Sequence, residues 1–226
     1  GRRGAIAPKT AAQANYLALL STRELTFGVG PAGTGKTFLA AAYGASLLRR
    51  GQVDRLVITR PAVEAGEKLG FLPGDLNEKV DPYLAPIWEA LNDILGPDDV
   101  RRRRDKGEIE AAPIAFMRGR TLAHAYIIVD EAQNTSRLQM KMVLTRLGEG
   151  ARMVVTGDPS QVDLLNPRDS GLKHALRILE DVKGVGVQRF EAQDVVRHAM
   201  VERIVRAYDA DSASRRPAAD LEDPDR

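Results

Sequence analysis

Eight residues decide the fold of this chain: Gly30-Pro31-Ala32-Gly33-Thr34-Gly35-Lys36-Thr37. They fit the pattern G-x-x-x-x-G-K-[ST], in which glycines let several backbone N–H groups approach one phosphate. The apolar run Leu25–Val29 precedes them and a helical pattern over 38–48 follows, so the turn should lead from a strand into the positive end of a helix. Lys36 would reach the β- and γ-phosphates, and the Thr37 hydroxyl would ligate Mg²⁺. These residues predict a nucleotide-binding site.

A second apolar run, 127–129, ends in the acidic residues Asp130 and Glu131. Open α/β sheets bind ligands at the carboxyl ends of their strands, so both carboxylates should face the glycine-rich turn. We expect Asp130 to hold Mg²⁺ through a bound water, and Glu131 to accept a proton from the water that attacks the γ-phosphate. Together with the glycine-rich turn, the acidic pair predicts hydrolysis of a nucleoside triphosphate.

Two glutamines are further candidates for contact with the nucleotide. Gln161 ends the string Thr156-Gly157-Asp158-Pro159-Ser160-Gln161, just past a strand, where its amide could hydrogen-bond the γ-phosphate or the attacking water. Gln13 precedes the strand Leu25–Val29, and its amide offers both a donor and an acceptor to an adenine edge. The alternatives are a plain polar turn at Gln161 and a surface glutamine on a helix at Gln13.

Short apolar runs alternate with helical patterns over residues 10–208. The expected strands are Leu25–Val29, Leu56–Thr59, Ile114–Met117, Tyr126–Val129, Met153–Thr156 and Val185–Phe190. Between them, Ser136 and Gln139 have the spacing of a capping box, and a helix is expected over 82–95. This alternation predicts an α/β fold with a doubly wound, mainly parallel sheet.

Composition excludes several classes of protein. Of 226 residues, 43% are hydrophobic and 28% charged, as in an ordinary globular domain. The absence of cysteine excludes disulfide scaffolds, thiolate zinc sites, iron–sulfur clusters and a cysteine nucleophile. No charge-free stretch reaches the roughly 20 residues that span a bilayer, and no signal peptide opens the chain. We therefore expect a cytoplasmic protein without a membrane partner.

Two segments stand apart from this regular alternation. The strand that ends at Thr59 and the strand that begins at Tyr126 are separated by more residues than one crossover needs, which predicts an insertion over 61–124. The insertion contains Arg101–Arg104, either a basic patch or a solvated helix end. Residues 1–9 form a lead-in, and the acidic tail 209–226 is expected to be disordered because it is rich in Ala, Pro, Ser and charge.

Five strings together resemble the PhoH-like ATPases, and the resemblance covers about residues 8–208. The strings are Thr59–Glu67, Leu69–Gly74, Met117–Leu122, Asp130–Thr135 and Val195–His198. The resemblance implies ATP and Mg²⁺ as ligands and a single RecA-like P-loop core related to the motor domains of superfamily 1 helicases. It places a helicase-like Q motif at Gln13, the two Walker motifs at Gly30–Thr37 and Asp130–Glu131, and a γ-phosphate-sensing glutamine at Gln161. Members of this family are linked to phosphate-starvation responses and RNA metabolism.

A single core of this kind leaves its ATP site open on one side unless a neighbouring subunit closes it. An arginine supplied by that neighbour can be worth about 10³–10⁵ in rate. We therefore expect a ring-shaped homo-oligomer, a hexamer, in line with the rings that some family members form. Arg197 is the first candidate for this arginine, in its own subunit or the next. Arg60, Arg118 and Arg120 are lower candidates, for which salt bridges or contacts with RNA are the alternatives.

Two functions remain open. The first is an ATPase coupled to single-stranded RNA, with an RNA-processing protein as a further candidate partner; aromatic residues are only 5% of the chain, and no stacking platform is evident from the sequence. The second is a nucleotide-dependent oligomeric adaptor that regulates a protein partner without unwinding RNA. A small-molecule kinase is weaker because Glu131 would place a base beside the attacking water. A GTPase is disfavoured because no Asn-Lys-x-Asp string occurs.

Overall fold

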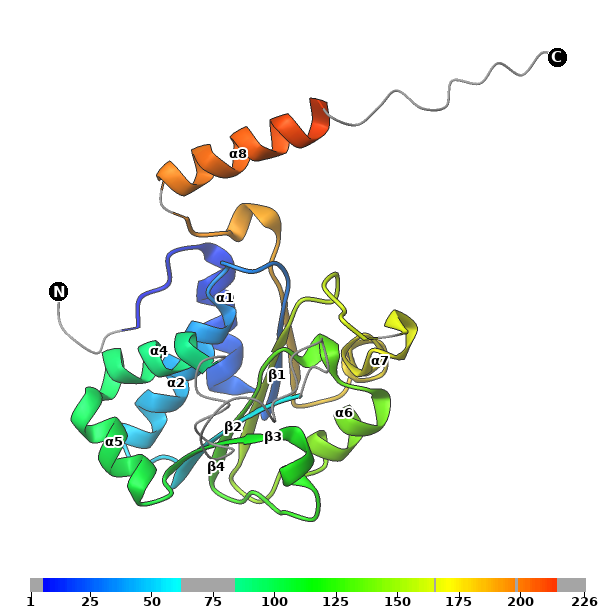
Figure 1. Ribbon diagram of the computed structural model, residues 1–226. Helices are drawn as coiled ribbons and strands as arrows, with labels where there is room; N and C mark the ends of the chain where they lie inside the picture. The colour runs from blue at the N-terminus through cyan, green and yellow to red at the C-terminus, as the bar shows by residue number, and fades with distance from the viewer. Residues whose placement is uncertain (1–5, 62–83, 165, 198, 215–226) are drawn as a thin grey trace, which may run out of the picture. The chain divides into compact units, whose positions relative to one another are not determined.

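Six parallel strands form one sheet in the order β3-β2-β4-β5-β1-β6, which confirms the α/β class (Figure 1). The computed structural model describes residues 6–61, 84–164, 166–197 and 199–214. The strands are β1 Leu25–Val29, β2 Arg55–Arg60, β3 Ile109–Pro113, β4 Ala125–Val129, β5 Arg152–Gly157 and β6 Val185–Arg189. Strand β5 lies between β1 and β4, so the segments that follow these three strands meet at one edge of the sheet.

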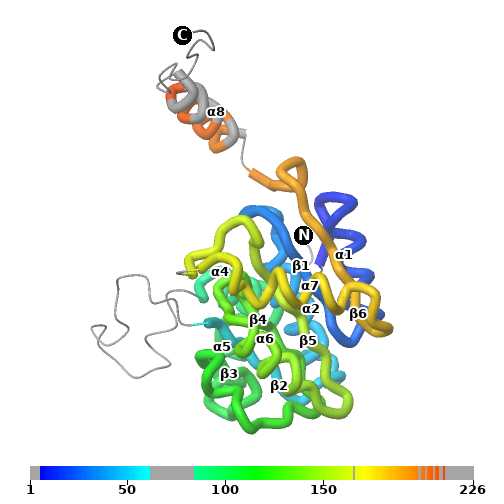
Figure 2. Tube along the Cα trace, turned by 90° about the vertical axis from the view of Figure 1, so that its right-hand side faces the viewer, coloured from blue at the N-terminus to red at the C-terminus, as the bar shows by residue number. Residues whose placement is uncertain are grey.

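Helices cover both faces of the sheet, which explains why β1 and β4 are buried at every position. The helices are α1 Ala11–Thr22, α2 Lys36–Arg49, α4 Ala85–Leu95, α5 Pro97–Asp105, α6 Arg137–Leu144 and α7 Gly171–Leu179. Alternate side chains of β4 enter two separate cores: Tyr126 and Ile128 pack with α1, α2 and α4, whereas Ile127 and Val129 pack with α6 and α7. Figure 2 views the sheet from the side of α6 and α7.

The expected strand at Ile114–Met117 is wrong. These residues form a 3₁₀ helix, η3, in which Ile114 and Met117 are buried. Three residues make one turn of such a helix, so an apolar pair at this spacing anchors it to the core. The strand lies just before it, at Ile109–Pro113, where only the first position is buried because β3 forms an edge of the sheet.

The insertion over 61–124 adds α4, α5, β3 and η3 to the fold, and its residues 62–83 lie outside the described part of the chain. The arginines at 101–104 behave as a helix end. Arg103 pairs with Asp99 and Glu108, Arg102 pairs with the same Asp99, and the guanidinium of Arg104 stacks 4.4 Å from the Trp88 ring centroid. Three of these four arginines therefore already have partners within the protein.

The acidic tail begins later than expected. The chain divides into two compact units; the first ends at Val195 and the second begins at Val196. Helix α8 of the second unit spans Ala199–Ser214, so residues 209–214 are helical rather than disordered. Ala is the strongest helix former, and Asp and Ser each cost at most about 0.7 kcal/mol relative to Ala in a helix, so this stretch contains no helix breaker. Residues 215–226 lie outside the described residues. Among the described helices, none is long and apolar enough to cross a bilayer.

Candidate nucleotide-binding site

The glycine-rich turn joins β1 to α2 through three glycines with positive φ. The φ angles are 141° at Gly30, 80° at Gly33 and 82° at Gly35, which other residues rarely adopt. A Cβ at Gly30 would lie 2.3 Å from the Phe190 carbonyl oxygen at the end of β6, and a Cβ at Gly35 would lie 2.8 Å from Gln13 Nε2. The neighbouring segments therefore enclose the turn tightly enough to require glycine.

Lys36 stands at the first position of α2 among three carboxylates. Its Nζ donates a hydrogen bond to the Pro31 carbonyl oxygen at 2.9 Å. Burial lowers the pKa of Lys36, and the nearby Asp158, Glu131 and Asp130 oppose that shift. A bound phosphate would offer this ammonium group a stronger partner than a main-chain carbonyl.

One carboxylate oxygen, Asp130 Oδ1, accepts hydrogen bonds from the hydroxyls of both Thr37 and Thr156. The hydroxyl of Thr37 donates to Asp130 Oδ1 at 3.0 Å, and the hydroxyl of Thr156, on β5, donates to the same atom at 2.7 Å. Hydroxyl and carboxylate oxygens are the donors that Mg²⁺ prefers, and this ion usually takes one or two carboxylates with waters and substrate phosphates. In the described residues, no three His, Cys, Asp or Glu side chains gather into a protein-only metal site. The donor set at Thr37 and Asp130 fits a nucleotide-bound Mg²⁺.

Glu131 is held in an unusual backbone conformation. Its φ of 51° and ψ of 38° lie in the left-handed region, which costs a residue with a side chain about 1–2 kcal/mol. Its Oε2 accepts a hydrogen bond from Gln133 Nε2 at 2.5 Å, and its Oε1 lies 3.9 Å from Arg60 Nη2 at the end of β2. The carboxylate is thus approached from two sides by donors.

Two amides that the sequence did not identify as functional tie the segment after β4 to the segment after β5. Gln133 Oε1 accepts from the Asp158 N–H at 3.1 Å, and Asn134 Oδ1 accepts from the Asp163 N–H at 2.9 Å. Both amides are almost fully buried. The available signal in the sequence was a pair of consecutive amides, Gln133 and Asn134, shortly after an apolar strand.

The structure gives Gln13 a role within the protein. Its Nε2 donates to the Thr34 carbonyl oxygen at 3.0 Å, and its Oε1 accepts from the Lys9 N–H at 2.8 Å. Thr10 caps α1 by accepting from the Gln13 N–H. Gln13 is therefore a buried residue that fastens the glycine-rich turn to α1, not a surface glutamine. Recognition of adenine by Gln13 stays a prediction and would require these partners to be exchanged.

The remaining candidates are less closely engaged with the site. Gln161 follows β5 with an exposed side chain, and its N–H donates to the Asp158 carbonyl oxygen. Arg120 forms a two-pronged ion pair with Glu110, at 2.7 and 2.8 Å, and its guanidinium lowers the pKa of that carboxyl; this supports the salt-bridge alternative. Arg118 is exposed after η3, and Arg197 is an exposed residue of the second unit. The role of Arg197 stays a prediction.

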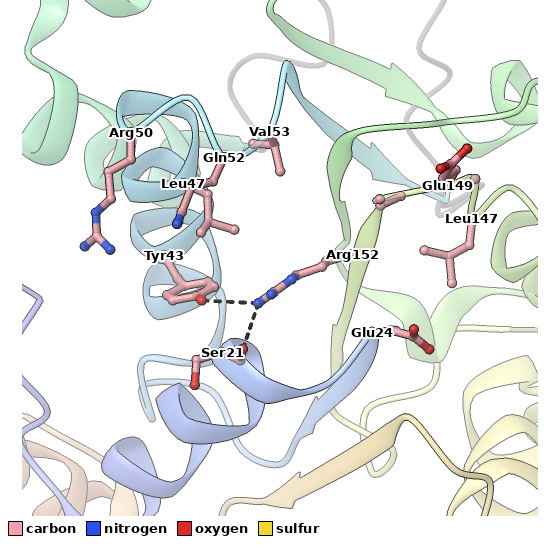
Figure 3. A pocket seen from close by; sticks show the side chains of 13 residues that line it. Ser21, Glu24, Tyr43, Leu47, Arg50, Gln52, Val53, Leu147, Glu149 and Arg152 are labelled. Carbon is pink, nitrogen blue, oxygen red and sulfur yellow. Dashed lines mark hydrogen bonds between the residues drawn. The ribbon is translucent and has the colours of Figure 1, made fainter.

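A separate cavity of about 940 Å³ lies around the amino end of β5 (Figure 3). Its most prominent cation, Arg152, donates to the carbonyl oxygens of Leu20 and Ser21 at 3.2 and 2.9 Å, and to the Tyr43 hydroxyl at 3.4 Å. These carbonyls belong to the last turn of α1, where a cation complements the helix dipole. We therefore assign Arg152 to the capping of α1.

Comparison with known proteins is consistent with this architecture. A family model described as "PhoH-like protein" matches residues 5–209. The chain is 53% identical over 218 residues to a PhoH-like protein of Synechocystis sp., covering 96% of this chain and 66% of that protein. It is 53% identical to a PhoH-like protein of Bacillus subtilis, covering 89% of this chain and 63% of that relative. It is 44% identical to Protein PhoH of Escherichia coli K12, covering 90% of this chain and 58% of that relative.

The chain thus spans about three-fifths to two-thirds of the length of these relatives. Among solved structures, the large terminase of a thermophilic bacteriophage superposes with a TM-score of 0.57 at 14% sequence identity. That match covers 88% of this chain and 50% of the terminase chain. At this identity the likeness concerns the fold alone.

Proposed function

The chain belongs to the PhoH-like protein family, as the resemblance predicted, and we propose that it is a Mg²⁺-dependent ATP hydrolase coupled to RNA. Family and fold together support a nucleotide-dependent function and nucleotide hydrolysis in general. The choice of ATP, the coupling to RNA and a role in RNA metabolism or the phosphate-starvation response are our proposals. ATP is preferred over GTP because the sequence lacks an Asn-Lys-x-Asp string.

One observation carries the hydrolase proposal. The segments after β1 and β4 meet at Asp130 Oδ1, which accepts from Thr37 at 3.0 Å, and Glu131 follows directly. In the proposed reaction, the glycine-rich turn and Lys36 bind the phosphates, while Thr37 and Asp130 hold Mg²⁺. A bound Mg²⁺ supplies charge neutralisation at the phosphates. Glu131 orients the attacking water and takes its proton.

The coupling to RNA is supported by an exposed aromatic side chain at the carboxyl end of β3. Phe116 is 54% exposed, although its neighbours Ile114 and Met117 in η3 are buried and hold the backbone in place. The exposed Arg118 follows two residues later. Strand β3 pairs with β2, whose last residue, Arg60, contacts Glu131. An exposed aromatic ring and an exposed cation two residues apart suit a base and a phosphate of single-stranded RNA, and the sequence alone did not reveal such a platform.

A ring-shaped homo-oligomer, with six subunits as our proposal, would complete the site. The chain supplies one RecA-like core, and a neighbouring subunit would contribute an arginine, for which Arg197 is our candidate. Because such an arginine accounts for about 10³–10⁵ in rate, a lone subunit would hydrolyse ATP slowly.

A nucleotide-dependent adaptor is the second candidate, and an apolar groove between α6 and α7 favours it. The groove has a volume of about 740 Å³, and its exposed apolar side chains include Leu138, Ile178 and Val182. Apolar surface of this kind suits a protein partner. In this function, ATP would set the oligomeric state that the partner recognises, without unwinding of RNA.

The deciding experiment is a measurement of ATP hydrolysis against protein concentration, with and without single-stranded RNA, with Glu131→Gln as the blank and GTP as the comparison nucleotide. A specific rate that rises with protein concentration and again with RNA supports the RNA-coupled ATPase. A rate that ignores RNA moves the assignment to the adaptor. A wild-type rate no higher than that of Glu131→Gln would contradict both the hydrolase and Glu131 as its base.

A further inference from the structure

Gln133 closes a link between two segments of the candidate site. It lies in η4, Ala132–Asn134, and its side chain is 2% exposed. A buried amide destabilises a fold unless its donor and acceptor are both satisfied. Here the amide bridges Glu131 and Asp158, at 2.5 Å on the Nε2 side and 3.1 Å on the Oε1 side.

The orientation of this amide follows from its partners. The Glu131 carboxylate, when ionised, only accepts hydrogen bonds, and the Asp158 N–H only donates, so Nε2 must face Glu131 and Oε1 must face Asp158. The backbone of Gln133 is also held, because the Ser170 hydroxyl donates to its carbonyl oxygen at 3.0 Å. Rotation of the amide would place two acceptors against each other at one end and two donors at the other.

The absence of a side chain at Gly157 leaves space for the Gln133 amide. A Cβ at that position would lie 2.7 Å from Gln133 Oε1, closer than non-bonded atoms approach. Gly157 is the last residue of β5, and the segment that follows it carries Gln161. The bridge therefore joins Glu131 to the start of the segment in which we expect the γ-phosphate to be sensed.

We propose that Gln133 is a positioning residue for hydrolysis: it orients the Glu131 carboxylate and ties its position to that of the segment Gly157–Gln161. This inference rests on the proposed function, in which Glu131 acts as the base. Gln133 needs no contact with ATP. Arg60 approaches the other carboxylate oxygen at 3.9 Å with a side chain that is 23% exposed, so Gln133 provides the shorter and more buried restraint.

The neighbouring residue offers a matched control. Asn134 is also a buried amide, and its Oδ1 accepts from a main-chain N–H of the same segment, at Asp163. Its own main-chain N–H donates to the Glu131 carbonyl oxygen, a bond that a side-chain substitution leaves in place, whereas its side chain is not bonded to the Glu131 carboxylate. Gln133→Met and Asn134→Leu each replace a buried amide with an apolar side chain of similar size. Both variants lose a main-chain hydrogen bond, and only the first loses a bond to the proposed base.

The experiment measures kcat, KM for ATP, the pH–rate profile and the affinity for a fluorescent ATP analogue. For Gln133→Met we expect kcat to fall about 10- to 100-fold, with KM and analogue affinity within about threefold of wild type, because the general base contributes about 10²–10⁴-fold. For Gln133→Glu, a carboxylate replaces the amide that donates to Glu131, so kcat should fall at least as far as in Gln133→Met. Asn134→Leu should keep the wild-type profile and most of kcat.

Two results would overturn the inference: wild-type kcat in Gln133→Met, or an equal loss of kcat in Asn134→Leu. Gln133→Met decides the question if Gln133→Glu does not bind the analogue. Failure of the proposed function looks different, because wild type would then be no faster than Glu131→Gln, whereas an active wild type with an equally active Gln133→Met removes only the role of Gln133.

Discussion

The Thr37 hydroxyl, in the first turn of α2, donates a hydrogen bond to Asp130 Oδ1 at 3.0 Å. Strand β5 lies between β1, which leads into the glycine-rich turn, and β4, which ends just before Asp130. Thr156 of β5 donates to the same oxygen at 2.7 Å, so β5 and the segments that follow β1 and β4 meet at one atom. This oxygen both organises the site and lies where Mg²⁺ is expected. Its two roles can be separated by experiment.

Asp130→Asn should keep the organising role and lose the metal role. An Asn Oδ1 can still accept from both hydroxyls, so thermal stability should change little. The Mg²⁺ concentration for half-maximal ATP hydrolysis should rise about 10- to 100-fold, as for the loss of a residue that holds a metal through its ligands. A Mg²⁺ titration of hydrolysis measures this, with Asp169→Asn, an exposed acid in η5 (Pro167–Asp169), as the control. An unchanged Mg²⁺ requirement would exclude Asp130 from the metal site.

Gln13→Leu should weaken ATP and GTP binding alike. The substitution leaves the Thr34 carbonyl and the Lys9 N–H without the partners they have now, at a cost of about 1–3 kcal/mol, and it loosens the glycine-rich turn that binds the phosphates of both nucleotides. The measurement is the Kd of each nucleotide, with Gln52→Leu as an exposed control. A loss confined to ATP would instead show that Gln13 reads adenine.

Lys36→Met should stabilise the nucleotide-free protein and abolish its response to ATP. Burial lowers the pKa of Lys36, so between that lowered pKa and the ordinary value the unfolded chain binds more protons than the folded one. Wild-type stability therefore rises with pH in this window, and the advantage of Lys36→Met should be largest at neutral pH and shrink as the pH rises through it. Thermal melts at several pH values, with and without Mg²⁺-ATP, measure both effects. A nucleotide-free variant that melts below wild type at pH 7 would contradict this argument.

Phe116→Ala should reduce the stimulation of hydrolysis by single-stranded RNA and leave the rate without RNA unchanged. Stacking of a base on an aromatic ring contributes about 1–3 kcal/mol, so the Kd for RNA should rise about 5- to 150-fold. Leu138→Ala is the control, because Leu138 is 70% exposed but lies on α6. Equal RNA affinity in the two variants would remove Phe116 from the RNA surface.

Arg197→Ala should slow hydrolysis by about 10³-fold or more with a modest loss of ATP affinity, if this residue supplies the arginine of the site. The inactive Arg197→Ala and Lys36→Ala proteins are then mixed in equal amounts. An arginine that acts across the interface would restore about a quarter of the interfaces in a closed ring, and hydrolysis with them. No recovery on mixing would leave Arg197 without a role in the neighbouring subunit.

The sequence predicted the central strands well because they are buried on both faces. β4 is a continuous apolar run and β1 is interrupted only by Thr26 and Gly28, a pattern that local composition alone can show. It failed at β3, where Ile109-Glu110-Ala111-Ala112-Pro113 forms an edge strand with little apolar character, and the more apolar Ile114–Met117 turned out to be the anchor of a 3₁₀ helix. Which residues of the edge strand β3 are buried depends on neighbouring elements that are distant in sequence, so local composition does not reveal it.

The candidate site shows the same division. Lys36, Thr37, Asp130 and Glu131 could be proposed from the sequence because their chemistry is tied to a short local pattern, and the structure brings them close together. The bridge through Gln133 could not, since it depends on the register that brings Gly157 and its following residue beside η4. Likewise, the sequence offered Gln13 as a ligand-reading side chain, whereas its packing against Gly35 shows it bonded to the glycine-rich turn.

The strand order has a consequence for how the chain acquires its activity during synthesis. β1 is completed early, yet both of its neighbours in the sheet, β5 and β6, are among the last parts of the core to be made; Leu25 pairs with Met153 on one side and Val185 on the other. Contacts this distant in sequence form slowly. The glycine-rich turn contacts Gly157 and Phe190, at the ends of β5 and β6. Its binding conformation therefore cannot be complete until the ribosome has synthesised both residues. Nucleotide binding thus becomes available only when the core is nearly complete, and a nascent chain stalled before β5 would bind none.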